Sequence, residues 1–293
     1  MIELAKGHIK VLIEEPEEGY SGTRFDWTGK IVQLWWKGIP FCSAEYKHDS
    51  SNSIGRGFFN EFGMTDPIGY ENCQVGSYFP KIGVGLLQKE NNECYDFFHT
   101  YKCKPLQFSQ LTKQDAIIYD CLNKEANSAF FLEKKITLKD DGFVIDYLLE
   151  NIGNQSIVTS EYVHNFLSPG KKMIAQNTKL FFGGKVDGEQ FNNGLNPDSV
   201  LRYNDRTINW NERPKADFFF EEIAASCKNA PNWILVNEEL ELGISESVDF
   251  QPSKINLWGR AHVVSPEIFK SIKLQPGETD RWQREYKVVD FCS

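Results

Sequence analysis

Short runs of alternating apolar and polar residues, each closed by turn-forming residues, recur along most of this 293-residue chain. Residues 143–150 (FVIDYLLE) follow the turn sequence KDDG and precede the turn sequence NIGNQS. A run of this length between two turn signals is typical of a β-strand that takes part in hairpins. The same pattern occurs at 30–36, 117–122, 129–138, 254–264 and 280–289. We therefore expect a fold built mainly of antiparallel strands.

Patterns with the 3.6-residue period of an amphipathic helix are nearly absent. The best helix candidate is 215–228 (KADFFFEEIAASCK), whose three consecutive phenylalanines suit a strand equally well. Residues 184–214 are polar and rich in turns, but apolar anchors such as Phe191 and Trp210 favour a long loop over a sandwich face rather than a domain linker. The sequence predicts an all-β protein, a large antiparallel β-sandwich that forms a single domain over residues 1–293.

Charge and hydropathy exclude several classes of partner. The net charge of −9 and the pI near 5.2 argue against nucleic acid, which needs a basic surface. No stretch of 18 apolar residues suggests a membrane span, and the N-terminus lacks the apolar core of a signal peptide. We expect a cytoplasmic protein. Its scattered cysteines then fit reduced thiols better than disulfides or a zinc site; they are Cys42, Cys73, Cys94, Cys103, Cys121, Cys227 and Cys292.

Conventional catalytic motifs are missing: there is no glycine-rich phosphate loop, HExxH pair or GxSxG elbow, and we expect neither metal nor cofactor. The histidines are isolated in sequence, at His8, His48, His99, His164 and His262. His164, within SEYVHNFLSPG (160–170), is the natural proton carrier near neutral pH. Glu267 follows a proline just past an expected strand and is the carboxylate that can partner it. From the residues alone, His164 is either a hydrogen-bonded structural residue or a catalytic one.

Several segments resemble the galactose mutarotase-like (aldose 1-epimerase) superfamily. SIKLQPGETDRWQREYKV (271–288) is similar to its closing strands, which commonly contain an L-x-PGE-x turn. EYVHNF (161–166) and VVSPEIF (263–269) resemble the segments that carry the catalytic histidine and glutamate. YSGTRFDWTGKIVQLWWKGIPF (20–41) resembles the opening hairpin. Together with NEFG (60–63) and KIGVGLLQKE (81–90), these segments look most like an uncharacterised branch of that superfamily, matched in order from about residue 20 to residue 289.

The resemblance implies a cofactor-free reaction on a small-molecule carbohydrate. Interconverting the anomers of an aldose takes a proton from the C1 hydroxyl and gives one to the ring oxygen, after which the ring opens, C1 rotates and the ring closes again. By the resemblance, Glu267 is the base at O1 and His164 the acid at the ring oxygen. Each positioned proton transfer is worth roughly 10²–10⁴-fold in rate.

One departure from the family pattern concerns the substrate. Sugar mutarotases usually carry an arginine followed by a His-Gly pair on an early strand, whereas GRGFFNEFGM (55–64) keeps Arg56 but has Glu61 near the place of that pair. Specificity for galactose or glucose is therefore not implied. Candidate sugar contacts are Arg24, Arg56, Glu61, Lys81, Trp258 and Arg260. Arg24 has an alternative, a structural ion pair with Asp26, and His262 is expected to be structural.

The favoured function is an aldose 1-epimerase-like enzyme acting on a free sugar or sugar derivative. The main alternative is a carbohydrate-binding or sensing protein that has kept the fold and lost turnover. A third is a hydrolase or lyase, which needs a second carboxylate about 5–10 Å from Glu267. The first two differ in whether His164 and Glu267 face each other across one cleft, and we expect their polar atoms to be about one sugar ring apart, with Trp258 nearby.

Overall fold

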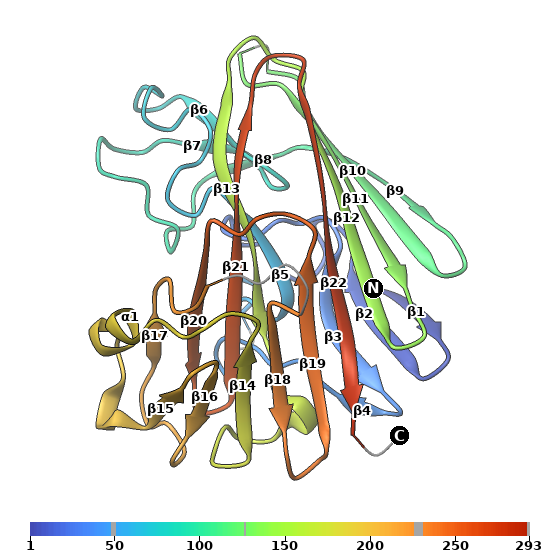
Figure 1. Cartoon of the computed structure of the whole chain (residues 1–293). Coiled ribbons are helices and arrows are strands. Elements are labelled where there is room, and N and C mark those ends of the chain that lie inside the picture. Colours follow the sequence, from blue (N-terminus) through green and yellow to red (C-terminus); the bar gives the residue numbers. More distant parts are fainter. Residues whose placement is uncertain (48–50, 126, 226–230, 292–293) are drawn as a thin grey trace.

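A computed structural model describes residues 1–47, 51–125, 127–225 and 231–291, and most of the strands in these residues belong to two large antiparallel sheets (Figure 1). The first sheet contains, in spatial order, β1 (Ile2–Lys6), β2 (Ile9–Glu14), β3 (Lys30–Trp36), β5 (Gly57–Phe62), β13 (Ile157–Phe166), β21 (Val263–Leu274), β20 (Lys254–Arg260) and β17 (Phe218–Phe220), with β4 (Ile39–Pro40) paired to β3. The prediction of an all-β class with a sandwich of antiparallel sheets is confirmed.

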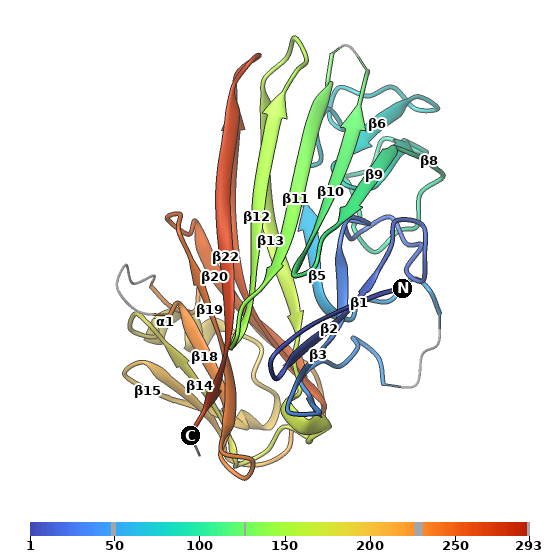
Figure 2. The same ribbon diagram turned by 90° about the vertical axis from the view of Figure 1, so that its right-hand side faces the viewer.

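The second sheet is built largely from long hairpins, and Figure 2 shows its β22-β12-β11-β10-β9 part as one continuous twisted layer. Its strands, in spatial order, are β15 (Leu201–Asn204), β16 (Thr207–Trp210), β14 (Thr178–Phe182), β18 (Trp233–Asn237), β19 (Leu242–Val248), β22 (Thr279–Asp290), β12 (Gly142–Asn151), β11 (Phe130–Leu138), β10 (Ala116–Asn123) and β9 (Gln107–Thr112). A small third sheet contains β6 (Tyr78–Lys81), β7 (Gly85–Gln88) and β8 (Cys103–Pro105). The helices of the described residues are short: α1 (Gly188–Asn193), η1 (Pro169–Lys171) and η2 (Pro197–Ser199).

Most of the strands expected from alternation are present, and three expectations need correction. The run 254–264 is not one strand, because a turn at 261–262 separates β20 from β21. The three phenylalanines of the candidate helix form β17, and residues 226–228 of that candidate lie outside the described residues. The stretch 184–214 is not a long loop, since its hairpin β15–β16 extends the second sheet.

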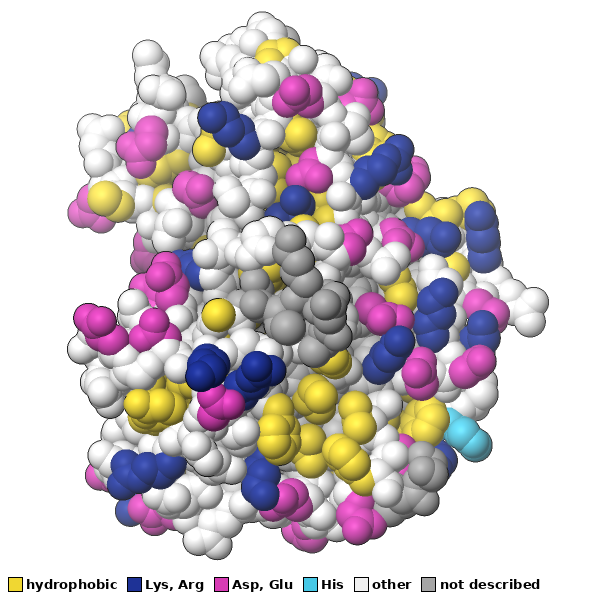
Figure 3. All heavy atoms as spheres, in the orientation of Figure 1, with side chains coloured by type: hydrophobic (Ala, Val, Ile, Leu, Met, Phe, Trp, Pro, Cys, Tyr) yellow, Lys and Arg dark blue, Asp and Glu magenta, His cyan; other side chains and the backbone are white. Residues whose placement is uncertain are grey.

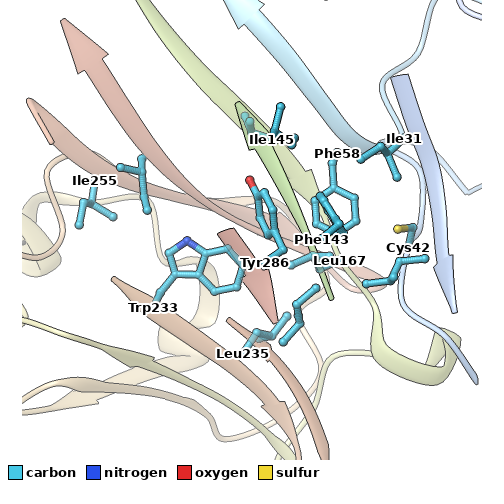
Figure 4. Packing of buried hydrophobic residues seen from close by; sticks show 14 of the residues in the cluster. Ile31, Cys42, Phe58, Phe143, Ile145, Leu167, Trp233, Leu235, Ile255 and Tyr286 are labelled. Carbon is cyan, nitrogen blue, oxygen red and sulfur yellow. The ribbon is translucent and has the colours of Figure 1, made fainter. Parts of the chain in front are cut away.

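The two sheets meet through aromatic and aliphatic side chains (Figure 4). Phe58 of the first sheet lies edge-on to Phe143 and Tyr286 of the second, with ring centroids 5.1 and 4.8 Å apart. Phe143 and Tyr286 stack on each other at 4.8 Å. On β22, the alternate residues Trp282, Arg284, Tyr286 and Val288 are all buried and lie on one face of the strand.

A buried ionic network lies between the same sheets. The Arg284 guanidinium donates through Nη2 to Glu161 (2.7 Å) and through Nη1 to Glu246 (2.6 Å). All three side chains are completely shielded from solvent. Burial raises the pKa of Glu246, and Arg284 opposes that effect. The network lies directly behind the face of β13 that carries the candidate site.

The outer face of the second sheet carries an apolar patch over β14 and β18 (Figure 3). Phe181, Ile234 and Val236 form it together with Phe291. This patch faces away from the first sheet, because the alternate residues Leu180 and Leu235 are the ones that enter the core. None of the helices within the described residues has the length and apolar character of a membrane span.

Candidate active site

The strand β13 sends successive side chains to opposite faces of the first sheet. Glu161 and Asn165 point toward the second sheet, where they bond Arg284 and Glu246. Tyr162 and His164 point to the opposite, outer face, where they meet residues from β21 and from the segment before β3. His164 is nonetheless only 4% exposed, because loops and neighbouring side chains cover this face.

The backbone ladder between β13 and β21 is interrupted beside His164. The paired residues run as far as Glu161–Lys270, and pairing resumes at Leu167–Val264. These two pairs have the same register, and in that register His164 lies opposite Glu267. In the gap, the Asn165 amide N–H donates to Ser265 Oγ (2.9 Å) and Asn165 Nδ2 donates to the Pro266 carbonyl (2.6 Å). Pro266 has no N–H to give to the ladder, so side chains take over the hydrogen bonding. Glu267 therefore lies within β21, not just past a strand as expected.

His164, Ser265 and Glu267 form a closed hydrogen-bonded triangle. Ser265 Oγ lies 2.9 Å from His164 Nδ1 and donates to Glu267 Oε1 at 3.1 Å. His164 Nε2 lies 3.2 Å from the same carboxyl oxygen. The expected separation by a sugar ring is therefore wrong: the two groups touch side by side on neighbouring strands. Ser265 and Glu267 share this face because they are two residues apart on one strand.

Burial sets the protonation of the triangle. It raises the pKa of Glu267 to about 8 and lowers that of His164 well below its usual range, with the nearby positive charge of Arg24 adding to the second shift. Both shifts favour the uncharged forms near neutral pH, a protonated carboxyl and a neutral imidazole. The three distances fit an arrangement in which Ser265 donates to Glu267, the imidazole proton is on Nδ1, and Nε2 accepts from the carboxyl group. The pair thus holds a single transferable proton.

Replacing Ser265 with alanine should raise the pKa of Glu267 further. The Ser265 hydroxyl donates to the carboxyl and partly offsets the effect of burial, so its loss favours the protonated form. We expect the Glu267 titration, followed by carbon-13 NMR of the side-chain carboxyl, to move upward from about 8. Ser271→Ala, an exposed position on the same strand, is the matched control. A downward shift, or no shift, would contradict the assigned hydrogen bond.

A second polar cluster adjoins this triangle and is centred on Glu61 of β5. Glu61 Oε2 accepts from Arg24 Nε (2.8 Å) and from the Tyr162 hydroxyl (2.7 Å), while Oε1 lies 3.4 Å from Lys81 Nζ. Arg24 Nη2 also donates to the Tyr162 hydroxyl at 2.9 Å. Lys81 is buried, which lowers its pKa to about 8, and it further donates to the Gly63 carbonyl. The sequence-predicted residues Arg24, Glu61 and Lys81 are thus brought together.

Aromatic rings enclose His164. Phe166 stacks on the imidazole at 3.9 Å, and the Trp258 ring lies edge-on at 5.1 Å. The Phe25 ring is 6.0 Å away and separates His164 from the surface. The expectation that Trp258 lies near the pair therefore agrees with the geometry, since Trp258 pairs with Ser265 across β20 and β21.

The remaining candidates lie farther from the triangle. Arg56 is bound by Glu14 rather than by the cluster around Glu61. Arg260 bonds Asp217 and the Glu45 carbonyl, and its guanidinium lies over the Tyr46 and Trp258 rings. This set of partners places Arg260 beside the site and Arg56 outside it.

Two expectations about pairing are decided by the contacts. His262 bonds the Ala44 carbonyl at 3.0 Å, a contact that fits the expected structural role. The alternative pairing of Arg24 with Asp26 is wrong, because Asp26 is buried against Thr28 and Lys134.

The cysteines of the described residues are free thiols; they are Cys42, Cys73, Cys94, Cys103 and Cys121. His48, Cys227 and Cys292 lie outside the described residues. Within the described residues, no group of three potential metal-ligating side chains is found.

A cavity of about 230 Å³ opens over Arg24. Arg24, Phe25, Glu45, Tyr46, Phe97 and Phe98 are among the residues that line it. A larger hollow of about 700 Å³ lies between the small third sheet and the β10–β11 turn, and both polar and apolar residues line it. Size alone would point to that hollow, but the buried acid–base groups lie behind the smaller cavity, which we take as the candidate site.

Several residues of the site were not predicted from the sequence. Ser265 and Tyr162 each lie two positions before a predicted catalytic residue on the same strand, so strand alternation was a usable signal for both. Glu45, Phe97 and Phe98 belong to loops, and the sequence carries no periodic signal that places a loop over a sheet face.

The fold has known counterparts, although no family model and no curated protein matches this chain by sequence. A putative aldose 1-epimerase from Escherichia coli K12 superposes with a TM-score of 0.59 at 12% identity, covering 98% of each chain. A galactose mutarotase-like protein from Clostridium acetobutylicum gives 0.59 at 12%, covering 98% of this chain and 94% of that one. An aldose epimerase homologue from C. elegans gives 0.53 at 8%, covering 99% and 98%. This chain has the galactose mutarotase-like fold.

Proposed function

We propose that this protein is an aldose 1-epimerase-like enzyme that interconverts the anomers of a free sugar or sugar derivative. The observation that carries the proposal is the 3.2 Å contact between His164 and Glu267, with Ser265 hydrogen-bonded to both. The epimerase-like proteins with the same fold make a sugar the natural substrate class.

A one-proton pair suits a reaction that needs one acid and one base at once. In the resting protein Glu267 holds the proton and His164 is the free base; transfer across the 3.2 Å contact produces the opposite assignment, in which Glu267 is the base. Ring opening uses Glu267 as the base and His164 as the acid. Ring closure uses the opposite assignment, with His164 as the base and Glu267 as the acid. Both arrangements have zero net charge, but the second is a buried ion pair, and the attraction between its two charges 3.2 Å apart offsets part of the cost of desolvating them.

The anomerisation rate should depend on pH in a way that follows from these pKa shifts. Above about pH 8 Glu267 loses the proton that it can transfer to His164, so kcat/KM should fall about tenfold per pH unit. Acid inactivation should begin only well below pH 6.5, because the pKa of His164 is lowered. Polarimetry between pH 5 and 10, corrected for the uncatalysed rate, gives the profile. An acid limb near pH 6.5, or full activity at pH 10, would contradict it.

A non-catalytic carbohydrate-binding protein is the second candidate, and the same contact favours it. His164 and Glu267 touch each other and each is only 4% exposed, so a sugar cannot lie between them without a rearrangement. A binding protein needs no such rearrangement. Freshly dissolved α-anomers of a panel of aldoses, followed by polarimetry and by calorimetric titration, separate the two candidates. Accelerated mutarotation of any sugar supports the enzyme, and binding without acceleration supports the second candidate.

A further inference from the structure

We propose that Glu45 sets the charge selectivity of this site: together with Arg24 it holds a hydroxyl group of a neutral sugar and rejects sugars that present a carboxylate or a phosphate there. This inference rests on the proposed function, because it requires a sugar to enter the cavity over Arg24. It holds equally for an enzyme and for a binding protein. It concerns which sugars are admitted and not whether they react.

The geometry leaves one donor and one acceptor facing each other. Arg24 uses Nε and Nη2 for Glu61 and Tyr162, and its Nη1 lies 3.8 Å from Glu45 Oε1, beyond hydrogen-bond distance. Within the described residues, neither Arg24 Nη1 nor Glu45 Oε1 makes a hydrogen bond. Arg24 and Glu45 both line the cavity, and their side chains remain 12% and 11% exposed.

A hydroxyl group is the chemical group that completes this pair. It donates one hydrogen bond to the Glu45 carboxylate and accepts another from the Arg24 guanidinium. An ionised carboxylate or phosphate oxygen only accepts, so it would satisfy Arg24 while meeting the negative charge of Glu45 at close range. The pair therefore discriminates by repulsion as well as by attraction.

Formal charges around the cavity offer an anion no compensation. Arg24 and Lys81 supply two positive charges, and Glu61 and Glu45 supply two negative ones, so the cluster is neutral when all four are ionised. The imidazole of His99, also at the rim, lies 3.1 Å from Glu90. An anionic sugar would give this half-buried group of residues an uncompensated negative charge, which is costly away from water.

Glu45 cannot easily turn away to admit an anion. Its backbone N–H donates to the Gly55 carbonyl at 2.9 Å, and its carbonyl accepts from Arg260 Nη1 at 3.2 Å. The preceding carbonyl, of Ala44, is bound by His262. Glu45 Oε2 accepts from the Gly55 N–H at 3.4 Å, which directs Oε1 toward Arg24.

The guanidinium is held equally firmly. The Arg24 carbon Cζ lies 4.5 Å from the centre of the Phe25 ring and 4.6 Å from that of Phe97. Contacts of this kind stabilise an arginine in place without using its N–H donors. Both partners of the hydroxyl site are thus preorganised.

The test compares neutral sugars with matched anions in the wild-type protein and in Glu45→Gln. Calorimetric titration would use glucose, galactose and mannose, each with its 6-uronate and its 6-phosphate. We expect the wild-type protein to bind the best neutral sugar at least about tenfold more tightly than its anionic counterparts. Glu45→Gln keeps the shape and removes the charge, so this ratio should fall by about tenfold or more.

Two further variants complete the design. Glu239→Gln removes a carboxylate from an exposed ion pair with Lys172, in the connection between β18 and β19, and should leave the ratio unchanged. Glu45→Asp keeps the charge but shortens the side chain, so it should weaken binding of the neutral sugar and still reject anions. Circular dichroism and thermal unfolding confirm that each variant is folded; if Glu45→Gln does not fold, Glu45→Asp decides the question by this pattern.

Each outcome supports or overturns the inference. A wild-type preference for anionic sugars, or an unchanged ratio in Glu45→Gln, overturns it while leaving the proposed function intact. Selective binding of neutral sugars without accelerated mutarotation supports it and counts against the enzyme. If none of the sugars binds, both the inference and the proposed carbohydrate function fail.

Discussion

Replacing Glu267 with glutamine should lower the rate of anomer interconversion by roughly two to four orders of magnitude, the usual worth of a positioned acid or base. Glutamine keeps the size of the side chain and can still accept from Ser265, but it cannot exchange the proton that Glu267 shares with His164. Sugar affinity should change little. Polarimetric initial rates, with binding measured separately by calorimetry, test both statements.

The same experiment has an internal control. His164→Asn should cause a loss of similar size, and the double variant should be little worse than either single one, because both residues act in one proton-transfer step. Equal rates in Glu267→Gln and in the wild-type protein would show that Glu267 takes no part in the reaction. Additive losses in the double variant would mean that the two residues act in separate steps.

Replacing Arg284 with methionine should lower the free energy of unfolding by about 3–5 kcal/mol, the range for breaking a buried ion pair by removing one partner. Glu161 and Glu246 would be left facing each other with no cation between them, both fully shielded from water. Methionine retains much of the packing volume, so the lost charge accounts for most of the effect. Urea-induced unfolding, followed by tryptophan fluorescence, measures the change.

Arg281→Met is the matched control, because Arg281 lies on the same strand and is exposed. It should change the free energy of unfolding by less than about 0.5 kcal/mol. Similar losses in both variants would show that the effect of Arg284→Met comes from the strand and not from the ionic network. The loss should also reach the candidate site, since Asn165 joins Glu246 to Ser265 through its amide and its backbone N–H.

Strand alternation made the fold predictable. Hydrophobic side chains must be buried on one face of each strand, and a two-residue period with turn residues between runs records that requirement directly in the sequence. The runs that became β3, β10, β11, β12 and β22 were identified for this reason. Places where the chain turns without a marked change in composition, such as Ala261–His262, were missed. The hairpin β15–β16 was missed because each of its strands has only four residues, too few for alternation to stand out from the turn-rich sequence around it.

The candidate site was predictable only in part. Residue chemistry and the resemblance to known segments were enough to single out His164 and Glu267, and the offset between β13 and β21 places them opposite each other. Their distance was not predictable, because it depends on an interruption of the ladder that arises where Ser265 and Pro266 meet Asn165. Nor could the sequence show that Arg24 lies with Glu61 and not with Asp26.

The sequence by itself determined the all-β class, most of the long strands, the acidic net charge and the two groups proposed to exchange a proton. Only the tertiary structure decided that these groups touch, that burial shifts their pKa values in opposite directions, and that Glu45 faces Arg24 beside a small cavity. The physical reason is the range of the interactions. Alternation and turn preference act between neighbours in the chain, whereas desolvation and the pairing of charges depend on which distant segments cover the same face of a sheet.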